Sequence, residues 1–255
     1  MKIRVLGCSS AIGGEARTSS YMIDDDILVD AGTGVGNLDI EELKNIDHVF
    51  LTHSHLDHIA CLPLIADSVG AMRDKPVTIH ARPQTLELLR KHIFNWQIWP
   101  DFTVVPSEEA PFMTMEEFSP GDVWENNGRQ IRSVSVNHTV PAVGYLIGNG
   151  SHVLALSGDT TVTNDFWQAI NESPNPRYLI LETTFPDAQV ELATVSKHLC
   201  PSMVQGELKK LQVRPEVFIT HMMPSDEATI MSELRERLPE FELNRLEPNH
   251  VFELN

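Results

Sequence analysis

The apolar positions of the chain fall into short runs of three to six residues, separated by glycine, proline, asparagine and acidic residues. Runs of this length between turn residues are typical of β-strands. We therefore predict eleven strands, at Ile3–Leu6, Ser20–Ile23, Ile27–Asp30, His48–Leu51, Val77–His80, Ile131–Val136, Val143–Ile147, Val153–Leu156, Tyr178–Leu181, Val217–Ile219 and Val251–Glu253.

Apolar positions spaced three to four residues apart predict helices. They are at Ile59–Val69, Thr85–Asn95, Asn164–Glu172, Pro201–Leu211 and Asp226–Leu238. Pro201 suits a first helical turn, and Ser225 is the expected N-cap of the last helix. Strands with helices between and after them favour an α/β fold of two packed sheets covered by helices, a four-layer αββα sandwich. We expect one domain over residues 1–255, with a lid or excursion at about 94–128 that includes the Pro- and Glu-rich stretch Pro100–Gly128.

One short segment, His53-Ser54-His55-Leu56-Asp57-His58, carries three histidines and an aspartate directly after a predicted strand. In an extended segment His53 and His55 point the same way. A turn into the following helix brings Asp57 and His58 to a second position, so one loop could hold two adjacent metal ions. The alternative is a His-rich surface loop without metal, which the cost of crowding polar groups beside a buried strand disfavours.

Three further polar residues, His138, Asp159 and His221, come after predicted strands. Asp159 suits a bridging position, because an anionic oxygen donor can face two ions. Each of the three alone would be an ordinary turn residue or a histidine bonded to backbone carbonyls. The two predicted ligand sets are His53, His55, His138 and Asp159 for one ion, and Asp57, His58, Asp159 and His221 for the other. Nitrogen and carboxylate donors suit zinc, and manganese or iron could substitute.

His198 precedes a predicted helix and has no coordination position left to fill. We predict that it contacts a substrate phosphate or protonates a leaving group. The aromatic segment His92–Phe102 could stack a purine, with Asn95, Trp96 and Trp99 as candidate substrate contacts. Its alternative is an aromatic lid or a subunit contact, and the two tryptophans would suit a homodimer. The other histidines lie singly and receive no role; they are His48, His80, His92, His152 and His250.

The charge of the chain bears on its partners. Among 255 residues, 36 acidic against 19 basic side chains give a formal net charge of −17, which disfavours long nucleic acid. A small anionic substrate remains compatible, because two bound divalent ions would dominate the field inside a pocket. No apolar run could span a membrane, and Met1–Gly7 alternates like a strand rather than a secretory signal. Three cysteines without a CxxC pair disfavour disulfides, so we expect a cytoplasmic protein.

The complete HxHxDH pattern at His53–His58 resembles the signature of the metallo-β-lactamase superfamily, whose fold is the αββα sandwich. Within that superfamily the chain resembles class II cyclic-nucleotide phosphodiesterases over nearly its whole length. The matching motifs are His53–Ile59, Asn137-His138, Ser157–Thr160, Glu182–Phe185, His198–Pro201 and Thr220-His221. Cys61, Pro63 and Thr184 depart from the residues usual in that family and leave the metal ligands untouched.

This resemblance implies a metal-dependent phosphodiester hydrolase that converts cAMP or cGMP to the 5′-monophosphate. In our hypothesis a hydroxide bridging two divalent ions attacks phosphorus, Asp57 orients it, and His198 assists the leaving oxygen.

The main alternative is a tRNA 3′-processing endonuclease of the ribonuclease Z type, which uses almost the same ligands. The acidic charge, the lack of a basic arm, and Leu181–Thr184 in place of a His-Glu-Ala-Thr motif argue against it. A thioester or lactam hydrolase is a weaker alternative. A non-catalytic nucleotide-binding protein is another, which the complete ligand set disfavours.

Overall fold

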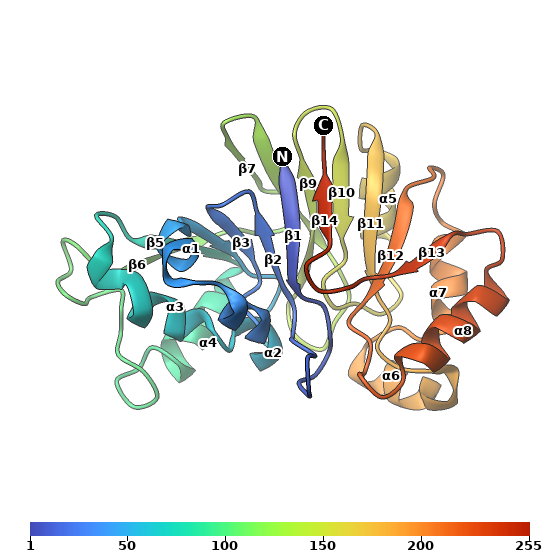
Figure 1. The fold of residues 1–255 in the computed structure, drawn as a ribbon, viewed down its shortest axis with the longest axis horizontal. Helices are drawn as coiled ribbons and strands as arrows, with labels where there is room; N and C mark the ends of the chain where they lie inside the picture. Colours follow the sequence, from blue (N-terminus) through green and yellow to red (C-terminus); the bar gives the residue numbers. More distant parts are fainter.

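The computed structural model describes residues 1–255 and contains two seven-stranded sheets packed face to face (Figure 1). The first sheet has, in spatial order, β14 (Val251–Glu253), β1 (Lys2–Gly7), β2 (Ser20–Ile23), β3 (Ile27–Val29), β4 (His48–Phe50), β5 (Val77–Ala81) and β6 (Met113–Glu117). The second has β13 (Leu243–Arg245), β12 (Glu216–Thr220), β11 (Pro176–Glu182), β10 (Val153–Leu156), β9 (Val143–Gly148), β8 (Arg129–Ser135) and β7 (Val123–Asn126).

Helices cover the outer faces of both sheets (Figure 1). They are α1 (Ile40–Asn45), α2 (Leu56–Ile59), α3 (Leu62–Val69), α4 (Pro83–His92), α5 (Asp165–Asn171), α6 (Val190–Ser196), α7 (Pro201–Leu208) and α8 (Glu227–Arg237), with short 3-10 helices at Thr33–Asn37, Gly70–Met72 and Asp187–Gln189. Pro201 occupies the first turn of α7 as expected. The N-cap of α8 is Asp226 rather than the predicted Ser225, and no side chain caps that helix. None of these helices is long and apolar enough to cross a membrane.

Three apolar clusters hold the layers together. The cluster between the sheets takes side chains from both of them, including Val5, Tyr145 and Ile180. A second cluster joins the outer face of the first sheet to α3 and α4, and a third joins the second sheet to α5, α7 and α8. Because the central strands are buried on both faces, they appear in the sequence as continuous apolar runs. The predicted αββα sandwich is confirmed.

All eleven predicted strands are present, with ends shifted by at most two residues. The predicted helix Ile59–Val69 corresponds to α3, and only its first residue belongs to α2, which begins before it at Leu56. Three strands, β6, β7 and β13, and two helices, α1 and α6, were not predicted. These strands lie at or near sheet edges, where alternate side chains reach solvent; most side chains of β7, for example, are exposed. An edge strand of this kind carries no apolar run for a sequence pattern to detect.

The prediction that Pro100–Gly128 leaves the sandwich is wrong for two stretches, because β6 and β7 belong to the two sheets. The residues before β6 also pack inward. Phe94 and Phe102 are buried in the cluster on the outer face of the first sheet. These two phenylalanines therefore contribute to packing.

Candidate metal centre

The predicted ligands lie in loops that follow strand ends, where the two sheets meet at one edge of the sandwich (Figure 1). His53 and His55 follow β4, and Asp57 and His58 belong to α2. His138, Asp159 and His221 follow β8, β10 and β12. The structure brings all seven side chains into the two predicted sets, and within each set the ligand atoms lie within 4.8 Å of one another. The predicted convergence is therefore observed.

Asp159 belongs to both sets and lies between them. Its Oδ1 is 3.4 Å from His221 Nε2, while its Oδ2 is 3.3 Å from His58 Nε2 and 3.6 Å from His53 Nε2. The preceding residue, Gly158, has a φ of +57°, and a Cβ on it would lie only 2.9 Å from the Val143 carbonyl oxygen, so a side chain is disfavoured there. With this tight turn before it, Asp159 can present one oxygen to each set.

Two buried histidine nitrogens indicate whether these residues fit metal ions. His53 Nε2 and His58 Nε2 point into the cluster and have no hydrogen-bond partner. Their other ring nitrogens are occupied: His58 Nδ1 lies 2.7 Å from Asp30 Oδ2 and His53 Nδ1 lies 3.0 Å from the Thr52 hydroxyl oxygen. A buried nitrogen without a partner is costly, and a cation at each set would satisfy it. The residues fit a pair of divalent ions.

Charges within the cluster shift several pKa values. Burial lowers the pKa of His53 well below its usual range, and burial also lowers that of His138 to about 4. Burial opposes ionisation of Asp159, but His221 and His58 outweigh it and hold the pKa of this carboxyl well below its usual value. Burial likewise lowers the pKa of His58, but Asp159 and Asp30 raise it more. These shifts favour the anionic form of Asp159 and the neutral forms of His53 and His138.

Asp30 is a site residue that the sequence analysis placed at a strand end without a role. It is buried, and its carboxylate accepts hydrogen bonds from His58 Nδ1–H and from the backbone N–H and hydroxyl of Thr52. Because a carboxylate cannot donate, this contact fixes the proton of His58 on Nδ1 and leaves Nε2 free for a metal. Its position directly after an apolar strand, like that of the ligands, was the available signal.

His198 lies beside the cluster and belongs to neither ligand set. Its ring stacks at 5.4 Å on His221, and its Nδ1 is 2.8 Å from Glu182 Oε1. Glu182 is fully buried and also accepts hydrogen bonds from the backbone N–H groups of Thr160 and Leu199. Burial lowers the pKa of His198, but the Glu182 carboxylate more than compensates and raises it to about 9. His198 is therefore a positioned, protonated imidazole.

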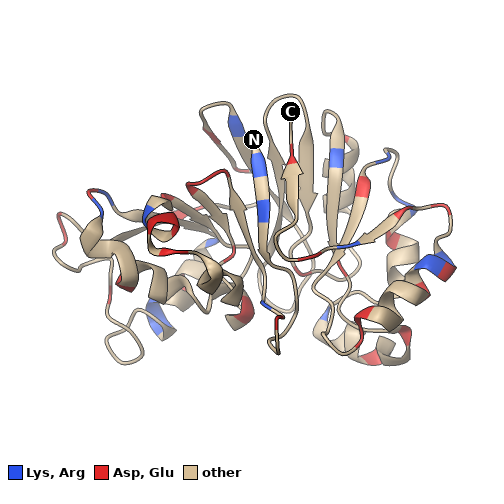
Figure 2. Ribbon diagram, in the orientation of Figure 1, with Lys and Arg blue, Asp and Glu red and all other residues tan.

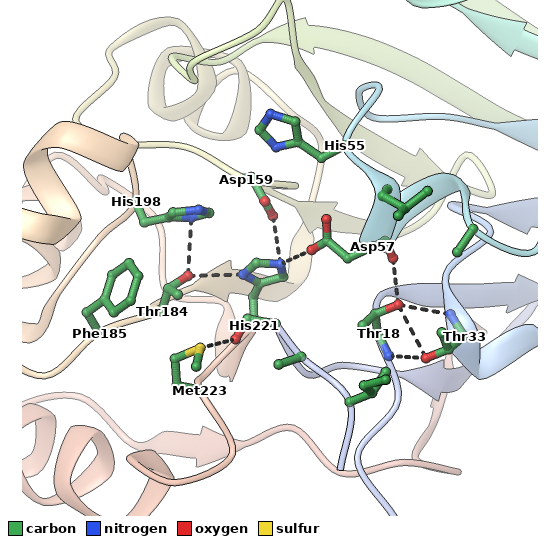
Figure 3. A pocket seen from close by; sticks show the side chains of 15 residues that line it. Thr18, Thr33, His55, Asp57, Asp159, Thr184, Phe185, His198, His221 and Met223 are labelled. Atoms are coloured by element: carbon green, nitrogen blue, oxygen red, sulfur yellow. Dashed lines mark hydrogen bonds and ion pairs between the residues drawn. The ribbon is translucent and has the colours of Figure 1, made fainter. Parts of the chain in front are cut away.

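A cavity of about 540 Å³ opens over the cluster (Figure 3). His55, Asp57, Asp159, His198 and His221 line it, so the candidate ligands and the protonated imidazole face the same space. No Lys or Arg side chain is among the lining residues. Asp57 is the more accessible carboxylate, with 29% of its side chain exposed against 3% for Asp159.

The structure does not bring the other predicted substrate contacts to this cavity. Asn95 turns back on its own loop and accepts hydrogen bonds from the backbone N–H groups of residues 97 and 98. Trp96 is largely exposed, and Trp99 packs against the core of the first sheet. None of the three lines the cavity. A homodimer through Trp96 stays a prediction.

The expectation that every remaining histidine lies singly is wrong for one pair. His48 Nδ1 and His80 Nε2, on the neighbouring strands β4 and β5, are hydrogen-bonded at 3.0 Å. His80 is buried and stacks on Phe50. Sequence spacing alone could not reveal this contact, because the two residues are 32 positions apart.

Comparisons with known proteins agree with this geometry. The family profile described as a beta-lactamase superfamily domain matches residues 25–237. The chain therefore belongs to this superfamily.

Among curated proteins, a probable 3′,5′-cyclic-nucleotide phosphodiesterase of Yersinia pestis is 26% identical over 206 residues, which cover 71% of this chain and 58% of the relative. A ribonuclease Z of Halorubrum lacusprofundi is 26% identical over 155 residues, covering 58% of this chain and 47% of the relative. The chain thus spans about half the length of these relatives.

Solved structures show the same fold at lower identity. Unliganded yeast PDE1 superposes with a TM-score of 0.81 at 18% identity over 98% of both chains. The metallo-beta-lactamase fold protein YhfI of Bacillus subtilis has a TM-score of 0.77 at 20% identity over 99% of both chains. At these identities the likeness establishes the fold alone. The profile match establishes the superfamily, and the histidine–aspartate cluster is a candidate metal site within this fold.

Proposed function

We propose that the protein is a two-metal phosphodiester hydrolase that opens 3′,5′-cyclic nucleotides, cAMP or cGMP, to the 5′-monophosphate. The observation that carries the proposal is the pairing of His198 with Glu182 beside the ligand cluster, with both His198 and the cluster facing one cavity. Hydrolysis of a ribose phosphodiester needs a nucleophilic water on one side of phosphorus and a proton for the alkoxide on the other. The similarity to the Yersinia phosphodiesterase supports the same substrate class.

The metal ions would be held by the two sets that share Asp159. Zinc suits this donor set, and manganese or iron could replace it. When bound, the ions would lower the pKa of water and stabilise negative charge on the phosphoryl oxygens. The hydrogen bonds that Asp30 accepts from Thr52 and His58, and the one that the Thr52 hydroxyl accepts from His53, would keep the ligating nitrogens unprotonated and oriented.

The chain's own residues then supply the proton transfers. The accessible carboxylate of Asp57 would accept a hydrogen bond from the attacking water and direct its oxygen at phosphorus. The water releases one proton to solvent, its oxygen forms the new bond to phosphorus, and the bond from phosphorus to O3′ breaks. His198 gives its proton to O3′, while Glu182 holds the ring by its other nitrogen. The product leaves as a 5′-monophosphate with a free 3′-hydroxyl.

A ribonuclease Z activity is the second candidate, because curated relatives include ribonucleases of that type. Two features oppose it. The formal charge of −17 repels a polyanion, and the Lys and Arg residues are scattered over separate elements without forming a stripe (Figure 2). RNA-binding surfaces depend on clustered basic groups.

The test is hydrolysis by protein loaded with Zn²⁺ or Mn²⁺, with metal content measured by elemental analysis. We expect cAMP or cGMP to yield the 5′-monophosphate, detected by chromatography. The absence of turnover for every diester in protein that holds two ions per chain would refute the proposal. Cleavage of a precursor tRNA with no cyclic-nucleotide turnover would favour the second candidate.

The variant His198→Gln sharpens this test. Without a proton donor, we expect the kcat for cAMP to fall by about 10²–10⁴-fold. Bis-p-nitrophenyl phosphate should lose far less, because p-nitrophenolate leaves without a proton. An equal loss on both substrates at unchanged metal content would show that His198 does not act on the leaving oxygen.

A further inference from the structure

The cavity over the cluster has an apolar part that the proposed chemistry does not use. Four large apolar side chains line it: Ile12, Leu56, Phe185 and Met223. Ile12 lies in the loop between β1 and β2, and Leu56 is the first residue of α2. Phe185 and Met223 follow β11 and β12. Both halves of the sandwich therefore contribute to the apolar walls.

The exposure of two of these side chains is unusual for their size. Ile12 is 70% exposed and Leu56 is 67% exposed, although both are large and apolar. Single exposed apolar residues are common, but two that line the same cavity beside a catalytic cluster form a surface that a ligand can cover. Covering them would remove apolar area from water and so contribute to binding.

Phe185 and Met223 form a second part of the apolar lining. Figure 3 shows Phe185 and Met223 on the His221 side of the cavity, and Thr18 and Thr33 beyond Asp57 on the other side. Phe185 contacts His198 edge-on, with ring centroids 5.9 Å apart. A planar group attached to a phosphate at the cluster would reach this apolar wall. A flat aromatic ring fits a site of this composition, because aromatic contacts add to apolar burial.

A polar group lies within the apolar part. The Ser10 hydroxyl lines the cavity and has one hydrogen-bond partner, the Met223 sulfur at 3.1 Å. A thioether is a weak acceptor, so this hydroxyl can exchange it for a ligand atom at little cost. An apolar surface with one such hydroxyl suits the face and edge of a nucleobase.

The charges of the lining residues restrict the charge that a bound substrate can carry. No Lys or Arg lines the cavity, and the imidazole of His198 is assigned to the leaving oxygen, so the second negative charge of a phosphate monoester would have no Lys or Arg partner there. A diester carries a single negative charge. Cavities that take terminal phosphates present basic side chains for bidentate or point-charge contacts.

We propose that Ile12, Leu56, Phe185 and Met223 form a subsite for a planar, apolar ester group such as a nucleobase, and that the cavity selects phosphodiesters of one negative charge over monoesters. This inference rests on the proposed function and names the substrate class of the same site. The side chains of the subsite determine specificity and take no part in the chemical step.

The first experiment keeps the leaving group constant. Metal-loaded protein hydrolyses methyl, phenyl and thymidine-5′ esters of p-nitrophenyl phosphate, and p-nitrophenyl phosphate itself is the monoester. We expect kcat/KM to rise at least about tenfold from the methyl to the phenyl and thymidine esters, and the monoester to react at least about a hundredfold more slowly than the phenyl diester.

The variant Ile12→Ser removes one wall, and Ile98→Ser is its matched control. Ile98 is 64% exposed, lies in a loop and does not line the cavity. We expect Ile12→Ser to lower kcat/KM for the phenyl ester about tenfold more than for the methyl ester, mainly through KM, and Ile98→Ser to change neither. Equal rates for the methyl and phenyl esters, a monoester as fast as the diester, or equal effects of the two variants would overturn the inference.

Binding of adenosine to metal-free protein, measured by calorimetry, gives a readout that needs no turnover. We expect wild-type protein and Ile98→Ser to bind it, and Ile12→Ser to bind about tenfold more weakly. If no diester is hydrolysed while adenosine binding still depends on Ile12, the proposed function fails and the subsite stands. If diesters are hydrolysed but adenosine binds equally to all three proteins or to none, the subsite fails and the function stands.

Discussion

Replacing Asp30 by asparagine should weaken metal binding although Asp30 belongs to neither ligand set. In the native protein Oδ1 accepts the backbone N–H of Thr52 at 2.8 Å, and Oδ2 accepts His58 Nδ1–H at 2.7 Å. An asparagine keeps one oxygen only. If that oxygen stays on the Thr52 N–H, the amide NH₂ faces His58 Nδ1, which must then give up its proton and accept. The proton moves to Nε2, the atom that points into the cluster.

The magnitude follows from the role of Asp30 as an orienting group. Loss of such a partner typically costs 10–100-fold in metal affinity. An opposing effect is smaller: removing the Asp30 charge lowers the pKa of His58 and weakens proton competition, but Asp159, the stronger influence on this pKa, remains. We therefore expect a net loss of about tenfold or more at the set that contains His58. The other set should lose less, because the Thr52 hydroxyl can still accept from His53.

The assay is competition between the protein and a chromophoric zinc chelator, which resolves two binding constants per chain. Asp47→Asn is the matched control, because Asp47 is a surface carboxylate paired with Arg73 and Lys75. We expect the control to bind zinc like the wild type. Asp30→Asn protein that is folded by circular dichroism and binds two zinc ions within twofold of wild-type affinity would refute this account of His58.

Three further predictions concern the neighbourhood of the site and the fold. Glu182→Gln removes the charge that raises the pKa of His198, so the alkaline limb of the pH–rate profile should move to lower pH. An unchanged alkaline limb would show that Glu182 does not control the protonation of His198 during catalysis. Gly158→Ala forces a side chain against the Val143 carbonyl at positive φ, and chemical denaturation should show a loss of about 1–3 kcal/mol in unfolding free energy. Burial lowers the pKa of His80 from 6.5 to about 4, so metal-free protein should lose up to about 3 kcal/mol of stability as the pH falls through this window, because the unfolded chain takes up the proton first. His80→Gln should flatten that pH dependence, and an equally steep profile in the variant would contradict it.

The sequence predicted the ligand cluster well because several ligands follow strands that are largely buried on both faces, namely β4, β10 and β12. Such strands are continuous apolar runs, so their ends are visible, and polar residues directly after them stand out. His53 and Asp159 are two of these. The common edge at which they meet follows from the layered fold, since loops at one end of a sandwich lie close together whatever their separation along the chain.

The features that were missed depend on contacts across the fold. Asp30 and Glu182 lie at strand ends like the ligands, but their roles depend on which histidine faces each of them, and sequence spacing does not contain that information. The aromatic segment was misassigned for a related reason. Apolar burial and base stacking call for the same residue types, and here Phe94 and Phe102 pack into the core. Edge strands such as β7 are difficult to predict because many of their side chains face solvent, so the sequence contains no apolar run at these positions.

The acidic surface and the absence of Lys and Arg from the cavity lining act in the same direction on substrate choice. The net charge of −17 keeps polyanions at a distance, since several contacts with phosphates need several basic partners. At the cluster itself two divalent ions would reverse the local field, so a small anion that reaches the cavity is attracted there. A cyclic nucleotide satisfies both conditions, because it carries a single charge and a base that can cover Ile12 and Leu56. The cleaved phosphate of a long RNA would be attracted to the two ions in the same way. Each of its neighbouring phosphates, however, would be repelled by the acidic surface, and no cluster of basic side chains offsets that repulsion.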